Sequence, residues 1–375
     1  MQRGVSRRRA LLGAGSLLAG SLAGCLGPPS GAAARARARQ PPADAPERFP
    51  PFADSRLPLG WSLETLAAEQ HPGGPPKDGI PSIDDPVYTT VDGASSFLAD
   101  RDIVFGAVRA GDAVAYPRRI LAHHEILNGE LGGDPVAVTY CPLTGTAMGF
   151  DRGPVTFGVS GWLVNNNLVM YDRGSDSRWP QVPATAVEGP AKGRSLREFR
   201  LVWTTFRRWQ RGHPESRVLT PDTGFARNYR SDPYGSYTPP SGYYANDQTF
   251  YFPLETDNRL HLKRVVVGTR TPAGTIAFLK DALRSAGVLT GSMGDTSLVA
   301  VFHSGLDTGY VYRNPENRHI SFESGTVRVD GEPTPPADLP LPRSYAFDAM
   351  WFAWAGFYPE TALVTAPSSH SASNR

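Results

Sequence analysis

The feature that most constrains the fold is a sequence pattern that occurs twice in the chain. Residues 126–138 contain Ile-Leu-Asn-Gly-Glu-Leu-Gly and then Val-Ala-Val, and residues 288–301 contain Val-Leu-Thr-Gly-Ser-Met-Gly and then Val-Ala-Val. Residues 205–220 and 350–365 also correspond, each with a Trp, a Pro and a Glu at matching places. Two copies are fewer than a solenoid needs to bury a shared core. The repeat therefore predicts two similar half-domains that pack as a pseudo-dimer.

Composition and local pattern predict a strand-rich α+β fold. The chain has 39 glycines and 35 prolines, which favours many turns between short strands. A helix is expected from Pro117 to Gly129, because proline suits the first helical position and positions 120, 121, 124 and 127 then follow at helical spacing. A short helix is expected at 205–212. Strands are expected at 103–108, 113–116, 136–140, 147–150, 155–159 and 165–171.

The chain is expected to have six segments. They are a signal at 1–25, a flexible tether at 26–52, a first half with an N-terminal wrap at 53–222, a tyrosine-rich connector at 223–262, a second half at 263–366 and a tail at 367–375. The tether has almost no large apolar side chains to offset its ordering entropy. The connector carries six tyrosines between Tyr229 and Tyr251. These tyrosines could stack on a small-molecule or glycan ligand, or they could cover the join between the two halves.

The N-terminus predicts export and lipid attachment. The run Ser6-Arg-Arg-Arg-Ala-Leu-Leu is typical of a twin-arginine signal, and the uncharged run that follows is shorter than the roughly 20 apolar residues of a membrane span. Leu22-Ala-Gly-Cys25 matches a lipobox, in which a peptidase cuts before a cysteine whose thiol receives diacylglycerol. We therefore expect an extracytoplasmic protein that is anchored to the cell membrane by lipid on Cys25.

The charge balance and the cysteine count narrow the partners and the chemistry. The 38 basic and 36 acidic residues nearly cancel, so the chain has no strong positive electrostatic field to attract nucleic acid, and we expect no nucleic-acid partner. With Cys25 lipidated, Cys141 has no partner within the chain and should not form a structural disulfide. Cys141 is therefore a candidate for metal ligation or catalysis.

The segment 116–148 carries the residues with the most chemistry. Within it, His123 and His124 precede a glutamate, and Cys141 ends an expected strand. Neighbours on a helix point about 100° apart, so only one imidazole can face inward, and His124 lies on the apolar face. Asn128, four residues further on, would orient the His124 imidazole or a bound water.

Comparison of the two halves separates chemistry from packing. The glycines, the Val-Ala-Val strand and the Trp/Pro pair occur in both halves, which is typical of residues that serve turns and packing. The histidines and Cys141 occur in the first half alone. At their places the second half has Ser285, Ala286 and Ser304. We therefore expect the chemistry in the first half and a scaffold role for the second.

Three interpretations of Cys141 and His124 remain open. They could bind copper or zinc, with Met148, Met170 or His123 as a further ligand, because thiolate, imidazole and thioether suit soft or borderline metals. Alternatively, His124 could lower the pKa of Cys141 and make it a catalytic nucleophile, with backbone N–H groups of the following turn stabilising an oxyanion. The third interpretation is a non-catalytic binding or structural protein in which both residues lie in the core.

A second polar segment has no clear counterpart in the second half. Asn165-Asn166-Asn167 is followed by Asp172 and Arg173. Asn165, Asn167 and Asp172 could line the same cleft as the candidate site. Alternatively, the asparagines could form a polar turn that closes a hairpin, with Asp172 and Arg173 paired at the surface.

Several motifs resemble those of a known family. They are His124-Glu-Ile126, Val138-Thr-Tyr-Cys-Pro-Leu-Thr-Gly145, Phe157-Gly-Val-Ser-Gly161, Leu168–Arg173, Trp179-Pro-Gln181 and Asp232-Pro-Tyr234. Over residues 75–366 the chain resembles the domain of unknown function 3179. The resemblance implies an exported prokaryotic protein of unassigned activity, and Cys141 and His124 fall on the family's positions. The family's usual motif is similar to Cys-Pro-Leu-Cys-Gly, and Thr144 replaces its second cysteine here, which speaks against a two-thiol site.

Overall fold

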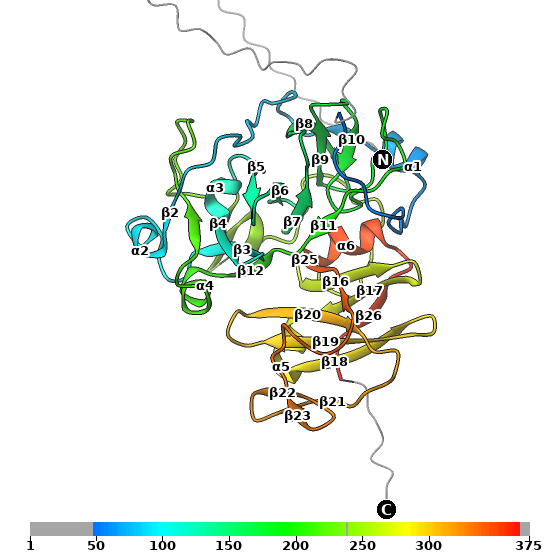
Figure 1. The fold of residues 1–375 in the computed structure, drawn as a ribbon. Coiled ribbons are helices and arrows are strands. Elements are labelled where there is room, and N and C mark those ends of the chain that lie inside the picture. Colours follow the sequence, from blue (N-terminus) through cyan, green and yellow to red (C-terminus); the bar gives the residue numbers. More distant parts are fainter. Residues whose placement is uncertain (1–47, 238, 368–375) are drawn as a thin grey trace, which may run out of the picture. The chain divides into compact units, whose positions relative to one another are not determined.

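Short strands dominate the structure, and its helices are brief. The computed structural model describes residues 48–237 and 239–367 (Figure 1). The predicted signal with Cys25, residues 26–47 of the predicted tether and residues 368–375 of the predicted tail lie outside the described residues. Within the described residues, the strand-rich character predicted from composition is confirmed.

The first half is built on three sheets, whose strand bounds are as follows. The strands are β1 (His71–Pro72), β2 (Tyr88–Thr90), β3 (Ile103–Arg109), β4 (Asp112–Pro117), β5 (Ile126–Leu131), β6 (Asp134–Cys141), β7 (Thr146–Asp151), β8 (Phe157–Val164), β9 (Asn167–Asp172), β10 (Arg178–Pro180), β11 (Glu198–Phe199), β12 (Val202–Thr205) and β13 (Arg217–Leu219). The three strand orders are β12-β3-β4-β13-β2, β11-β7-β6-β5 and β1-β8-β9-β10. The candidate site lies where β6 ends.

The second half has three further sheets. Its strands are β16 (Val265–Thr271), β17 (Gly274–Leu279), β18 (Val288–Met293), β19 (Thr296–His303), β20 (Thr308–Arg313), β21 (Ile320–Glu323), β22 (Thr326–Val329), β23 (Glu332–Pro333), β24 (Arg343–Ser344), β25 (Ala346–Met350) and β26 (Ala362–Val364). The strand orders are β25-β16-β17-β26, β18-β19-β20-β24 and β21-β22-β23. The connector contributes the small hairpin of β14 (Gly235–Tyr237) and β15 (Pro240–Gly242).

The helices are short. They are α1 (Leu63–Ala68), α2 (Val91–Ala94), α3 (Arg118–Leu121), α4 (Phe206–Gly212), α5 (Lys280–Ala286) and α6 (Trp351–Phe357), with the 3-10 turn η1 (Tyr243–Ala245) in the connector. The helix predicted at 205–212 is confirmed as α4, whose N-terminal N–H groups are capped by Thr205 through its hydroxyl oxygen.

The helix predicted from Pro117 to Gly129 is wrong beyond Leu121. The chain leaves α3 there, passes through a turn that ends at Glu125, and continues as strand β5, which pairs with β6. The backbone φ of Glu125 is 60°, a left-handed conformation that a helix does not contain. This turn decides which side chains of the His-His-Glu triplet point into the protein.

The leading sheets of the two halves share one strand order. The order β12-β3-β4-β13 corresponds to β25-β16-β17-β26, with β13 parallel to β4 and β26 parallel to β17, and the first sheet continues beyond β13 with β2. Each sheet also packs a tryptophan against a glycine. A Cβ atom added at Gly106 would lie 1.9 Å from the Trp209 ring, and one at Gly268 would lie 2.3 Å from the Trp354 ring. The repeated glycines therefore leave room for an indole ring.

The largest hydrophobic core cluster crosses from one half to the other. It contains Cys141 and Trp179 of the first half, Tyr243 of the connector, and Trp351 and Trp354 of the second half. In Figure 1, α6 of the second half lies beside the sheets of the first half, consistent with this shared core. The two halves therefore depend on each other for burial.

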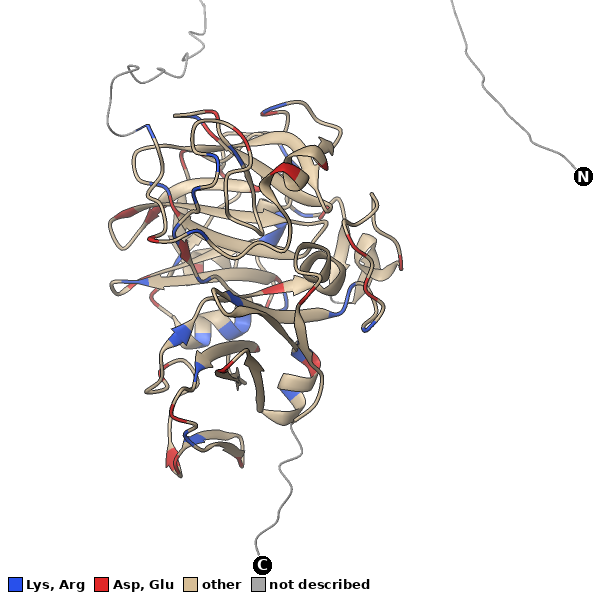
Figure 2. Ribbon diagram, turned by 90° about the vertical axis from the view of Figure 1, so that its right-hand side faces the viewer, with Lys and Arg blue, Asp and Glu red and all other residues tan. Residues whose placement is uncertain are grey.

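Charged residues of both signs occur across the fold, and a few large apolar side chains are exposed. Figure 2 shows basic and acidic residues of both signs dispersed over the fold. Large exposed apolar side chains among the described residues include Phe250 and Phe252 of the connector. No helix of the described part of the chain has the length and apolar character needed to cross a membrane.

Candidate functional site

His124 is a buried, hydrogen-bonded imidazole. Its Nδ1 lies 2.7 Å from the Pro81 carbonyl oxygen and its Nε2 lies 2.5 Å from the Tyr229 hydroxyl. Since a carbonyl only accepts, Nδ1 carries the proton and Nε2 accepts from Tyr229. Burial lowers the pKa of His124, which agrees with a neutral ring. Both ring nitrogens are therefore already occupied by protein groups.

Cys141 is a buried, neutral thiol. Cys141 is the last residue of β6 and is 1% exposed. Its Sγ lies 3.5 Å from the Asn166 carbonyl oxygen. Burial raises the pKa of Cys141 to about 11, and the nearby Glu125 carboxyl adds to this effect. At neutral pH the thiol is therefore protonated and acts as a weak donor to Asn166.

Glu125 is the residue that the sequence-based prediction did not assign to the site. It is 7% exposed, and burial raises the pKa of its carboxyl to about 8. Within residues 48–237 and 239–367, its carboxyl makes no hydrogen bond or ion pair. It lies close enough to Cys141 and Tyr234 for its charge to raise the pKa of both groups. A buried carboxyl without a partner is costly, and such groups are enriched at functional sites.

The connector covers this pair with tyrosines. The Tyr243 hydroxyl donates to the Leu143 carbonyl oxygen at 2.7 Å, two residues after Cys141. The Tyr244 hydroxyl lies 3.2 Å from that of Tyr140. Near these rings, the buried guanidinium of Arg118 is paired with Asp232 of the connector. Tyr243 and Tyr244 of the connector therefore cover the site at the C-terminal end of β6.

A network of neutral polar side chains lies beside Cys141. The Asn167 amide donates to the Thr144 hydroxyl at 3.0 Å and to the Gln181 side-chain oxygen at 2.9 Å. Gln181 in turn donates to the Thr139 hydroxyl at 2.8 Å. Thr144, which stands in place of the second cysteine in the motif, has its hydroxyl 2.8 Å from that of Thr146 and is fully buried. This network fixes the strand ends around the thiol without introducing a charge.

The asparagine segment forms a hairpin turn that also holds other parts of the chain. Asn165 and Asn166 have φ values of 51° and 59° between β8 and β9, as a type I′ turn requires. The Asn165 amide donates to the Ala353 carbonyl oxygen at 3.0 Å, and Asn166 exchanges hydrogen bonds of 2.8 and 2.9 Å with the backbone of Tyr251. The turn interpretation of these residues is therefore confirmed, and Asn167 alone reaches the network beside Cys141.

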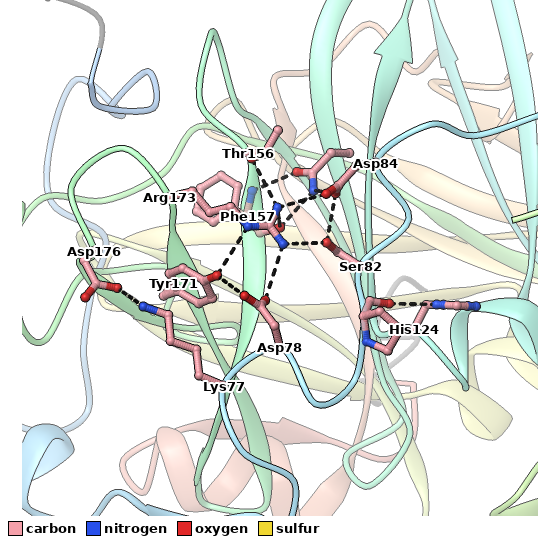
Figure 3. Close-up of polar contacts among 12 residues, drawn as sticks. Lys77, Asp78, Ser82, Asp84, His124, Thr156, Phe157, Tyr171, Arg173 and Asp176 are labelled. Carbon is pink, nitrogen blue, oxygen red and sulfur yellow. Dashed lines mark hydrogen bonds and ion pairs between the residues drawn. The ribbon is translucent and has the colours of Figure 1, made fainter. Parts of the chain in front are cut away.

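Asp172 and Arg173 do not pair with each other, contrary to the prediction of a surface ion pair. Asp172 is buried and accepts hydrogen bonds from the Trp179 indole at 2.9 Å and from Ser175. Arg173 lies between two carboxylates, 3.3 Å from Asp78 and 3.1 Å from Asp84, as Figure 3 shows. Asp172 therefore organises the turn after β9.

Asn128 does not orient the His124 imidazole. Because it lies on β5 instead of a helix, its amide donates to Asp84 at 2.7 Å and to the Phe157 carbonyl oxygen at 2.8 Å. Its side-chain oxygen accepts from the Phe157 N–H at 2.9 Å. The prediction that Asn128 positions His124 is wrong, and Asn128 joins β5 to β8 instead.

The other predicted metal ligands lie in different surroundings. Met148 and Met170 are fully buried and belong to the same core cluster as Cys141. His123 lies at the rim, where its Nε2 is 3.0 Å from the Ser231 carbonyl oxygen. Within the described part of the chain, no group of three or more His, Cys, Asp or Glu side chains is arranged to hold a metal ion.

Comparison with known proteins places the chain in one family. No curated protein and no solved structure matches it significantly. A family model described as "Protein of unknown function (DUF3179)" matches residues 77–361, which is most of the chain and includes both halves. The chain belongs to this family of proteins of unknown function.

Proposed function

We propose that the chain is an exported, lipid-anchored protein whose first half binds one divalent zinc or copper ion through Cys141 and Glu125. The single observation that carries this proposal is the Glu125 carboxyl, which is buried, has no described partner and lies beside a buried thiol. The twin-arginine and lipobox motifs support the export and the anchor at Cys25.

Charge balance favours this pair over Cys141 with His124. A thiolate and a carboxylate together neutralise a divalent ion, so the loaded site would bury no net charge. A thiolate with a neutral imidazole would leave one uncompensated positive charge. His124 also has both ring nitrogens bonded to Pro81 and Tyr229, so it is better suited to holding the turn before Glu125 than to ligation.

Neutral groups beside Cys141 could complete the coordination. Met148 and Met170 offer thioethers from the same core cluster, and Thr144 offers a hydroxyl close to the thiol. Thioethers favour copper and hydroxyls favour harder ions. Because Met148 and Met170 lie in this cluster, copper is proposed as an alternative to zinc.

Elemental analysis of protein purified without affinity-tag histidines tests the metal site. We expect about one equivalent of zinc or copper in the wild type and its loss in Cys141→Ser and in Glu125→Gln. Glu130→Gln, at an exposed position of the strand β5 that follows Glu125, should retain the ion. Metal loss in His124→Gln with retention in Glu125→Gln would instead assign the imidazole as the ligand, and no tight binding of added Cu(II) or Zn(II) by the wild type would refute the site.

Proton release distinguishes the proposed ligand pair from a single thiolate. Both groups are protonated in the metal-free protein at pH 6.5, because burial raises the pKa of Glu125 to about 8 and of Cys141 to about 11. A divalent ion held by both should displace about two protons. Calorimetry in buffers with different ionisation enthalpies measures this number, and release of about one proton would mean that Glu125 is either already ionised in the metal-free protein or not a ligand.

The arguments against a thiolate nucleophile are physical. A thiol that is 1% exposed with a pKa near 11 carries almost no thiolate at neutral pH. His124 does not reach it as a base, because its ring is held by Tyr229. Cysteine catalysis therefore remains the weaker alternative.

A second candidate function is binding of a neutral polar ligand, such as a glycan, on the connector. A pocket of about 600 Å³ there is lined by Tyr234, Tyr243 and Phe250 together with the amides of Asn246 and Gln248. Aromatic rings and amides are the groups that stack on and hydrogen-bond to sugars. Phe250→Ala should weaken glycan binding in an array or calorimetry experiment, and unchanged binding would refute this candidate.

We also infer that the two halves arose by duplication. The repeated sequence, the shared sheet order and the two glycine–tryptophan contacts support this inference. The serine and alanine residues of the second half at the places of Cys141 and the histidines then mark it as a scaffold copy.

A further inference from the structure

A large pocket lies where the first half meets the second half. Its volume is about 830 Å³, which is in the range of small-molecule sites. The first half contributes residues of β3, β12 and α4, and the second half contributes the turn after β19, β20 and residues near Ala337. The lining includes none of the residues of the proposed metal site, so what this pocket binds is independent of that proposal.

The lining of this pocket is strongly basic. Arg200, Arg208, Arg211 and Arg343 all belong to it, and its carboxylate, Asp338, lies 4.0 Å from Arg343. Among the described residues, the other three arginines form no ion pair. This concentration of one sign differs from the mixed charge over the rest of the fold (Figure 2).

Backbone carbonyls hold two of these guanidinium groups in place without neutralising them. Arg200 donates to the Ala346 and Gly309 carbonyl oxygens and to the Thr308 hydroxyl, so both of its terminal nitrogens are already bonded within the protein. Arg208 donates to the Ser304 carbonyl oxygen at 2.5 Å. Neutral acceptors therefore orient both guanidinium groups, while the charge of Arg208 also interacts with the Asp307 carboxylate.

Aromatic rings form the other wall of the pocket. The guanidinium groups of Arg200 and Arg343 lie over the Tyr310 ring, 4.8 and 4.9 Å from its centroid. The Trp209 ring is fully buried, and the centroid of the half-buried His213 ring lies 4.1 Å from that of Trp209. A ligand here would meet guanidinium groups together with the side chains of His213, Phe199 and Val108.

We propose that this pocket binds a phosphate monoester or diester that carries an apolar or ring-containing group. Arg208 and Arg211, which form no ion pair among the described residues, suit phosphate, because the planar guanidinium donates two parallel hydrogen bonds to phosphate oxygens. The aromatic wall suits the organic part of such a ligand. The phosphate can belong to a soluble ester or to the headgroup of an anionic lipid, and the pocket recognises the chemistry that the two share.

Calorimetric titration of the full chain with phenyl phosphate, inorganic phosphate and phenol tests the proposal. We expect saturable binding of phenyl phosphate, at least tenfold weaker binding of inorganic phosphate and no binding of phenol. Arg208→Gln combined with Arg211→Gln should weaken phenyl phosphate binding at least tenfold. Arg200 is left unchanged in this test because it links the two halves.

Arg207→Gln is the matched control. Arg207 is on the same helix, is 53% exposed and pairs with Asp100 at 3.0 Å outside the pocket. It should bind phenyl phosphate like the wild type. Absence of saturable binding, equal losses in the control and the double variant, or preference for a dicarboxylate over phenyl phosphate would each overturn the proposal.

Vesicles distinguish the two sources of phosphate. If the wild type co-sediments with phosphatidylglycerol vesicles but not with phosphatidylcholine vesicles, and the Arg208/Arg211 double variant does not, the ligand is a lipid headgroup. If phenyl phosphate binds and no vesicle does, the ligand is a soluble ester. Either result supports the pocket as a phosphate site, whereas vesicle binding that survives in the double variant contradicts it.

Discussion

Replacing Glu125 with glutamine should stabilise the metal-free protein, and more so at high pH than at low pH. Glu125 is 7% exposed, and burial raises its pKa from 4.5 to about 8. A carboxyl whose pKa is higher in the folded state holds its proton more tightly when folded. The associated stability is therefore fully present below about pH 4.5 and is lost as the pH rises through about 8.

The expected magnitude follows from the two pKa values. The difference between 4.5 and about 8 corresponds to roughly 5 kcal/mol, at about 1.4 kcal/mol for each tenfold change in proton affinity. Glutamine has nearly the same shape and carries no charge, so it removes this cost. The variant should lie within about 1 kcal/mol of the wild type at pH 5 and exceed it by roughly 3 to 5 kcal/mol at pH 8.5.

Denaturant unfolding in the presence of a chelator, at pH 5, 7 and 8.5, measures the difference. Glu130→Gln serves as the control because Glu130 is exposed on β5, the strand that follows Glu125, and its effect should stay within about 0.5 kcal/mol at every pH. A difference between Glu125→Gln and wild type that does not change with pH would refute the reasoning. It would mean that the Glu125 carboxylate is charged and satisfied in the folded protein.

Three further experiments test other predictions. Cys25→Ala should release the protein from the membrane fraction or leave its leader uncut, and unchanged fractionation at the original mobility would contradict lipid attachment. Gly106→Ala should destabilise the fold by about 2 to 4 kcal/mol in thermal unfolding, because its Cβ would lie 1.9 Å from the Trp209 ring. Gly212→Ala, with its nearest neighbouring atom at 3.8 Å, should not destabilise the fold, and equal losses in both would argue against the ring contact. Cys141 should resist alkylation until the metal-free protein is unfolded, since it is 1% exposed; fast labelling of the native protein would contradict its burial.

Sequence periodicity located six of the thirteen strands described in the first half, β3, β4 and β6 to β9, but could not separate a buried strand from a helix after Leu121. Ile126 and Leu127 belong to different core clusters, so both faces of β5 are apolar. A strand buried on both faces shows neither the period of two nor the period of 3.6 residues. Pairing of Ile126 with Thr139 makes this segment a strand instead of a helix, and the two residues are 13 positions apart in the sequence.

The missed end of the helix at Leu121 also explains why the sequence did not predict Glu125 as the neighbour of Cys141. An unbroken helix would have presented His124 to the site, whereas the left-handed backbone of Glu125 turns the chain just before β5. His124 then reaches Tyr229, and the carboxyl of Glu125 comes close to the thiol. Both side chains are buried, but the positive φ of Glu125 brings its carboxyl, and not the His124 imidazole, close to Cys141, and no pattern of apolar residues encodes this conformation.

The asparagine turn between β8 and β9 makes the folding of the two halves a single cooperative event. Four polar groups of Asn165 and Asn166 are satisfied by Tyr251, Leu254 and Ala353, all of which come after the first half in the chain. A fragment ending at residue 222 would lack these four hydrogen bonds, each worth about 0.5 to 1.5 kcal/mol to folding. It would also expose the apolar core that the first half shares with Trp351 and Trp354, and the two losses together are comparable with the whole stability of an ordinary domain. A ribosome that has made only the first half has therefore not yet made a stable fold, and we expect the chain to reach its native structure only after the second half has been synthesised.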